Sequence, residues 1–188
     1  MFFSKFFVPA VALLSAAAGV FASPIAEPAP VNALIEKRGG QDVYNACQHV
    51  YDSCHPHIVK ITPHAPTVDV VAAVDAIVAV FVQAEVDLAV FVGVDISAQI
   101  VAIVNIHIKL LTELFLALKA CVAVNASILA KIDIVLKAYL AILARINASL
   151  CGKIGAGLPI LVQLYINLKL TLCVSLLGLL NISIGINL

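Results

Sequence analysis

Residues 68–92 read VDVVAAVDAIVAVFVQAEVDLAVFV, a run dominated by valine and alanine that ends at Gly93. A single strand cannot hold this run, because strands in globular proteins are usually about 3–10 residues long. A helix can hold it, and glycine is favoured immediately after a helix end. The run therefore predicts a long apolar helix, and its composition is typical of the chain that follows.

Breaks downstream of this run divide the rest of the chain into three further helices. Asp95 is placed to cap the first of them, and Asn125 or Ser127 opens the next. The stretch 151–157 (CGKIGAG) predicts a turn, and Pro159 suits the first turn of the last helix. We expect the three helices at about 95–121, 125–151 and 159–178.

Polar side chains follow narrow stripes on these helices, so most of each helix surface is apolar. Between 125 and 151, one face at helical spacing carries Asp133, Lys137, Arg145 and Ser149. Strands remain an alternative where polar and apolar residues alternate, at 105–110, 166–173 and 181–188. The length of the apolar segments favours helices for the body of the protein.

The part of the chain over 39–66 is more polar. Asp42 is placed to cap a helix over 43–53, which the sequence His55-Pro56-His57 would end. Mixed histidine and cysteine ligands at short spacing can hold zinc or copper, but the spacing here matches no zinc module. We therefore interpret the histidines as solvated turn residues and expect no metal and no other cofactor. The histidines are His49, His55, His57 and His64, beside Cys47 and Cys54.

The first 38 residues have the features of a leader that is removed in two steps. Residues 1–22 combine a basic start, an apolar stretch and a small-residue site that ends at Ala22, which is typical of a signal peptide. Residues 23–38 are rich in proline and end in the dibasic pair Lys37-Arg38. This arrangement resembles the leaders of many fungal secreted proteins. We expect a mature chain from Gly39 to Leu188.

Composition and charge exclude several classes of protein. The chain is 63% hydrophobic and 12% charged and lacks tryptophan, whereas ordinary domains are roughly 45–50% apolar and 25% charged. Basic residues show no clustering of the kind that nucleic acid requires, so we expect no nucleic-acid partner. No nucleophile, phosphate-loop or metal-helix motif is present, so we expect no enzyme activity.

Charge is divided along the mature chain. Residues 39–97 hold seven acids and one base, and residues 98–188 hold seven bases and two acids. We favour the interpretation that acidic early segments lie beside basic late ones in one fold. The alternative is that opposite halves of neighbouring molecules attract each other and guide assembly.

Five cysteines in a secreted chain predict disulfides, with one thiol left over. A helix over 125–150 is about 39 Å long, so Cys121 and Cys151 lie at opposite ends of a bundle and cannot bond. The return of the last helix permits Cys121–Cys173. Of Cys47 and Cys54, one would pair with Cys151 and the other would stay free. The predicted fold is all-α: a disulfide-linked bundle of four long apolar helices over 67–188, with a short polar N-terminal helix.

Three Asn-x-Ser triplets are candidate glycosylation sites, at Asn125, Asn147 and Asn181. The first two fall at predicted helix ends, where a glycan could be carried on the surface. Such sites suit a secreted polypeptide better than one threaded through a bilayer.

The order of leader, dibasic site, polar segment and apolar segment resembles the small hydrophobic proteins, other than hydrophobins, that mushroom-forming fungi secrete. The resemblance implies association with cell walls and aerial hyphae. We expect a secreted, surface-active or wall-associated structural protein that self-associates at apolar surfaces. Two alternatives remain: a carrier of a lipid-like ligand, and a secreted protein that acts on membranes.

Overall fold

The computed structural model describes residues 39–158, 168 and 170–178. The predicted signal peptide, the propeptide, and with them Ala22, Lys37 and Arg38, lie outside the described residues. So do the tail from residue 179 on, including Asn181, and half of the helix predicted over 159–178. In the described half, only Thr171–Leu176 is helical.

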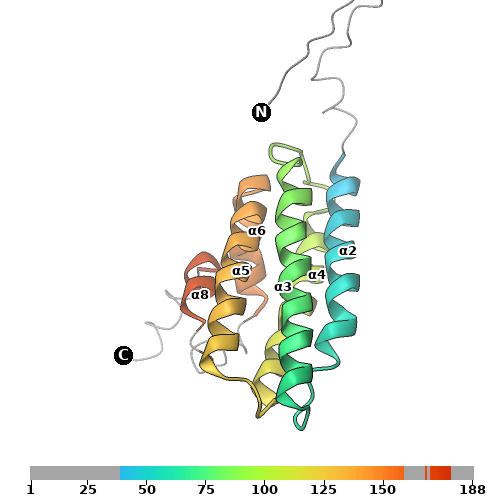
Figure 1. The fold of residues 1–188 in the computed structure, drawn as a ribbon. Helices are drawn as coiled ribbons and strands as arrows, with labels where there is room; N and C mark the ends of the chain where they lie inside the picture. Colours follow the sequence, from blue (N-terminus) through green and yellow to red (C-terminus); the bar gives the residue numbers. More distant parts are fainter. Residues whose placement is uncertain (1–38, 159–167, 169, 179–188) are drawn as a thin grey trace, which may run out of the picture.

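The described part of the chain is helical and contains no strand, so the predicted all-α class is confirmed. The alternative of a strand at 105–110 is wrong, because these residues lie within a long helix. The helices, labelled in Figure 1, are α2 (Gly40–Ile58), α3 (Thr67–Ala89), α4 (Ile100–Ala120), α5 (Ala126–Ile146), α6 (Ser149–Ala156) and α8 (Thr171–Leu176).

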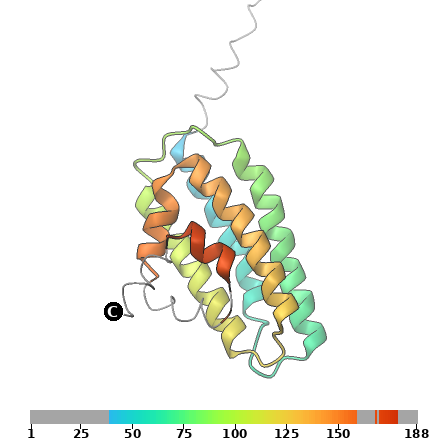
Figure 2. The ribbon, with the colours of Figure 1, turned by 90° about the vertical axis from the view of Figure 1, so that its left-hand side faces the viewer.

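The helices are arranged so that α3 and α4 lie at opposite corners. Helix α2 packs against both of them, α3 also packs against α5, and α6 lies between α4 and α5. Figure 2 shows this plainly, with α5 in front, α3 on one side and α4 on the other, while α2 runs behind. The short helix α8 packs against α5. The outward faces of α3 and α4 therefore point in opposite directions.

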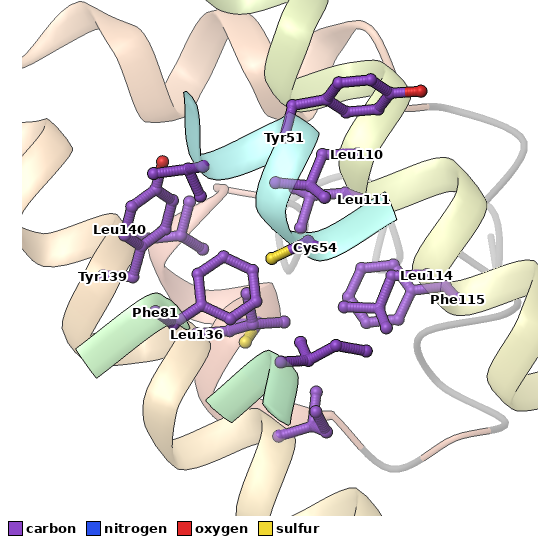
Figure 3. Packing of buried hydrophobic residues seen from close by; sticks show 14 of the residues in the cluster. Tyr51, Cys54, Phe81, Leu110, Leu111, Leu114, Phe115, Leu136, Tyr139 and Leu140 are labelled. Carbon is purple, nitrogen blue, oxygen red and sulfur yellow. The ribbon is translucent and has the colours of Figure 1, made fainter. Parts of the chain in front are cut away.

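One continuous core joins the helices. The inward face of α3 repeats every three or four residues, which is the spacing that keeps side chains on one side of a helix. Its Phe81 lies against Tyr139 of α5, with ring centroids 4.9 Å apart, and Cys54 of α2 is buried in the same core (Figure 3). The buried residues of α3 are Val70, Ala73, Val74, Ile77, Phe81, Ala84 and Leu88.

The N-terminal helix differs from the short polar helix that we predicted. It does not stop at His55 but continues through Pro56 to Ile58. Proline lacks the N–H of a helical residue and costs about 3 kcal/mol inside a helix. Here it falls in the last turn, and the chain beyond it buries Ile58 and Ile61 in the core, each worth about 1.5–3 kcal/mol. Helix α2 is thus a full member of the bundle.

The turn predicted over 151–157 is also wrong, because most of this stretch forms α6. Its glycines allow close packing instead. A Cβ on Gly155 would overlap the carbonyl oxygen of Leu177, and one on Gly157 would overlap the side chain of Ile108. Gly152, by contrast, has open space around it.

The cap predicted at Asp95 has a different role from the one expected. Its carboxylate accepts from the backbone N–H and the hydroxyl of Ser97, at 2.9 and 2.5 Å. These hydrogen bonds lower the pKa of Asp95. The carboxylate therefore closes a turn before the helix, and α4 begins five residues later, at Ile100.

Candidate functional site

The most unusual surface of the described chain is the outward side of α3, which we call the α3 outer face. Its residues fall within about 100° of one another on the helix, directly opposite the buried side. Single exposed valines are common, but a stripe of many exposed apolar residues on one side of a helix marks an interaction surface. The face consists of Val68, Val71, Ala72, Asp75, Ala79, Val82, Val86, Ala89 and Val90, all exposed.

The valines of this face are well exposed: Val68 by 78%, Val86 by 64% and Val90 by 52%. An amphipathic helix of a globular protein normally places polar residues on the side away from the core. Helix α3 instead repeats valine on both sides. The sequence already contained this signal, since a helical projection of 68–92 separates two apolar stripes, but we predicted only a mostly apolar surface and assigned it no site.

Acidic side chains border the α3 outer face. Helix α3 carries Asp69, Asp75, Glu85 and Asp87 and no basic residue. Within the face, Asp75 accepts from Lys131 Nζ of α5 at 2.5 Å. Desolvation raises the pKa of Glu85. The Asp75–Lys131 pair agrees with the interpretation that acidic early segments contact basic late ones within one fold.

The opposite corner of the molecule has the opposite charge. The outward side of α4, here the α4 outer face, consists of Val101, Asn105, Lys109, Leu116 and Lys119, all exposed. Lys109 also lies over the ring of Tyr51, with Nζ 4.6 Å from the centroid. The acid of this helix, Glu113, points toward α2, where it accepts from Tyr51 and pairs with His55.

A hollow of about 330 Å³ lies between α2 and α3. Small and apolar side chains form most of it, among them Ala46, Ala79 and Ala84, and His49, Ser53 and Asp87 supply polar atoms. Its volume is at the lower end of the range in which small ligands bind, about 300–1,000 Å³.

Of the polar and charged side chains in the described part of the chain, His107 of α4 and Asp133 of α5 are buried, and His107 is the deeper of the two. Its Nε2 lies 2.7 Å from the Tyr139 hydroxyl and its Nδ1 lies 2.7 Å from the Ile103 carbonyl oxygen. Burial lowers its pKa to about 4. Because both ring nitrogens are satisfied and no solvent reaches them, the arrangement stabilises the core and offers no catalytic group.

All five cysteines are free thiols, so the predicted disulfides are wrong. All five are buried, and two of the thiols bond to backbone carbonyl oxygens. The Cys151 thiol donates to the Leu140 carbonyl and the Cys173 thiol to the Asp133 carbonyl, seven residues apart on α5. Cys47 and Cys54 are likewise seven residues apart on α2, about 10 Å, whereas a disulfide needs Cα atoms within about 7 Å. Cys121 follows the end of α4. Burial raises the pKa of Cys47 and of Cys54 to about 12.

Of the histidines that we expected in turns, His64 lies in one. His49, His55 and His57 lie on α2 rather than in turns, while Cys47 and Cys54 of the same helix are buried. Within residues 39–158, 168 and 170–178, no three histidine, cysteine or acidic side chains gather to hold a metal ion.

Two of the three candidate glycosylation sites are described, and both lie at the ends of α5, as predicted. Asn125 is its N-cap and accepts from the Ile128 N–H at 3.1 Å. Asn147 follows its last residue and accepts from the Ser149 N–H and hydroxyl. Both serines of these triplets, Ser127 and Ser149, are exposed.

Among the described residues, α3 and α4 are long and apolar enough to cross a membrane by length and composition. About a third of the α3 window and two fifths of the α4 window are buried inside the protein, and the core helices of soluble proteins can also satisfy this criterion.

Comparison of the chain with protein-family models, characterised proteins and solved structures gives no match.

Proposed function

We propose that this is a secreted structural protein that adsorbs at apolar surfaces, and that the α3 outer face is its contact surface. The observation that carries the proposal is the stripe of exposed valines on α3. Removing apolar surface from water yields about 25 cal/mol per Å², so several valines on one face provide several kcal/mol for adsorption. The composition of the chain and the absence of catalytic motifs support a role in coating, attachment or assembly.

Secretion and processing belong to this proposal. The leader predicts cleavage after Ala22 and after Arg38, and the mature protein would act outside the cell or in its wall. N-terminal sequencing of the secreted protein should give Gly39. A mature chain that begins at Ser23 would contradict the second cleavage.

The bundle of long helices would stay folded as it adsorbs. The inward side of α3 remains in the core while the outward side contacts the surface, so adsorption needs no unfolding. Circular dichroism of the adsorbed protein should therefore show undiminished helix content.

Adsorption can be tested with near-isosteric substitutions. We expect Val82→Thr/Val86→Thr to lower the surface pressure that the protein develops at an air–water interface, because both hydroxyls would have to be dehydrated. The matched control is Val59→Thr/Val122→Thr, which alters two valines that are 57% and 86% exposed away from α3. The control should behave like the unmodified protein. Equal surface pressures for the two variants would refute the assignment of the face.

A second candidate function is transport of an apolar ligand in the hollow between α2 and α3. Native mass spectrometry of the purified protein would show a bound lipid-like molecule, and Ala79→Leu, which fills the hollow, should abolish its binding.

A third class, action on membranes, is supported by the length and apolar composition of α3 and α4. Release of dye from vesicles would reveal it.

A further inference from the structure

The two outer faces are complementary in charge and point in opposite directions. The α3 outer face is bordered by the acids Asp69, Glu85 and Asp87, and its one base, Lys131 of α5, is paired with Asp75. The α4 outer face instead contains Lys109 and Lys119. Helix α2 packs between these helices, and Figure 2 shows them on opposite sides of the molecule. An acid-bordered face and a lysine-bearing face therefore lie on opposite sides of one molecule.

We propose that the α3 outer face of one molecule docks on the α4 outer face of a second copy, so that copies join head to tail. The inference deepens the proposed function, on which it rests, because it names a protein partner for the same apolar face. The apolar residues of the α4 outer face, Val101 and Leu116, are exposed and would pack against the valines of the partner copy.

Like-charge repulsion argues against the symmetric alternatives. Two α3 outer faces would bring Glu85 and Asp87 of one copy toward the same acids of the other. Two α4 outer faces would oppose Lys109 and Lys119 with themselves. Like charges that face each other across an interface weaken binding of that partner, and opposite charges strengthen it. Docking of α3 on α4 brings acids to bases and valines to apolar side chains.

The two helices also match in length. Helix α3 has 23 residues and α4 has 21, so they extend about 34 and 31 Å at 1.5 Å per residue. The steps between residues are one, three or four positions on the α3 outer face and three, four or seven on the α4 outer face. Each set therefore stays on one side of its helix. Each face can therefore contact the other over most of its length.

Head-to-tail contact does not close on itself when the two faces point apart. A heterologous interface leaves one free face at each end of the assembly, and copies continue to add unless the rotation between them closes a ring. We therefore expect a concentration-dependent series of oligomers rather than a single dimer.

Charge reversal with rescue tests the docking. In the full secreted chain at low ionic strength, Lys119→Glu should weaken assembly about tenfold, measured by sedimentation velocity, and so should Asp87→Lys. A 1:1 mixture of the two variants should assemble about as well as the unmodified protein, because each interface then joins opposite charges. Lys137→Glu, an equal change at an exposed position of α5, is the control and should leave assembly unchanged. Lys119→Gln provides a milder variant should Lys119→Glu fold poorly.

Each outcome decides between the interfaces. A protein that remains monomeric at high concentration, or a mixture that is no better than either variant alone, overturns the docking. The same holds if Lys137→Glu weakens assembly as much as Lys119→Glu does. The proposed adsorption is tested separately, since Lys119→Glu leaves the α3 outer face intact. This variant should adsorb normally at an air–water interface, at concentrations where the protein is monomeric.

Discussion

His107 Nδ1 donates to the Ile103 carbonyl oxygen, and His107 Nε2 accepts from the Tyr139 hydroxyl, each at 2.7 Å. The carbonyl oxygen can only accept, so the proton of the neutral ring must be on Nδ1, and Nε2 is left with its lone pair. The core therefore holds a neutral histidine in one tautomer.

This arrangement predicts loss of stability in acid. The pKa of His107 is lowered by burial from 6.5 to about 4. The stability that the neutral ring contributes is therefore fully present above pH 6.5 and is lost as the pH falls toward 4. One pKa unit corresponds to about 1.4 kcal/mol, so complete protonation removes about 3 kcal/mol. Chemical denaturation of the protein and of His107→Gln between pH 7.5 and about 4 measures the difference. Parallel pH curves would contradict the prediction.

Asp133 should be important for the position of α8. Its two carboxylate oxygens accept from the backbone N–H groups of Leu172 and Cys173, at 3.0 and 2.9 Å. We expect Asp133→Ala to lower the free energy of unfolding by about 1–3 kcal/mol, because a buried and a partly buried N–H both lose their acceptor. The rate of backbone amide hydrogen exchange over residues 171–176 should rise in the same variant. The control, Asp75→Asn, disrupts an exposed ion pair and should cost less than about 1 kcal/mol.

Two glycines of α6 should respond oppositely to alanine. A Cβ on Gly155 would overlap the Leu177 carbonyl, so we expect Gly155→Ala to destabilise the protein by about 1–3 kcal/mol. Gly152 has open space, and Gly152→Ala should stabilise the helix by up to about 1 kcal/mol. Thermal unfolding of the two variants is sufficient to compare them. Equal changes would show that α6 does not pack against Leu177 as described.

Asn125 has two separable roles. As the N-cap of α5 it accepts from the Ile128 N–H, and its triplet is a candidate glycosylation site. Asn125→Ala should cost about 1 kcal/mol, whereas Asn125→Ser keeps an oxygen that can cap the helix and should cost little. Both variants remove the triplet. Mass spectrometry of the secreted variants, beside the unmodified protein, therefore reports glycan use independently of folding.

The cysteines should behave as buried thiols. Because the pKa of Cys47 and of Cys54 rises from 9.0 to about 12, their thiolate fraction at pH 8 falls about a thousandfold. A chromogenic disulfide reagent should react with almost none of the five cysteines in the native protein and with all five after denaturation. A Cys121–Cys173 peptide recovered without reduction would contradict this state.

The sequence predicted the helical class and most breaks, because long runs of valine and alanine leave few other solutions. The break before Thr67 and the stop near Gly93 are close to the observed ends of α3. Other local signals were overruled by packing. Pro56 marks a helix end in isolation, but burial of Ile58 carries α2 beyond it. Gly155 indicates a turn, yet its lack of a side chain serves contact with Leu177.

Partners across the core could not be predicted either. Asp133 shares a helical stripe with Lys137 and was expected among exposed polar residues. The structure buries it against α8, where two backbone donors hold its carboxylate. The cysteine count indicated disulfides because counting ignores position. Only the three-dimensional arrangement shows five buried free thiols, two of them bonded to backbone carbonyl oxygens.

The buried thiols also determine whether unfolding of the protein is reversible. While the fold is intact, the buried thiols cannot reach and attack a disulfide of another molecule. One complete opening exposes five at once, and in an oxidising medium they would link at random within and between chains before the fold re-forms. Unfolding then becomes a one-way event. In such a medium the lifetime of the protein would be set by the rate of that first opening rather than by an equilibrium between folded and unfolded chains.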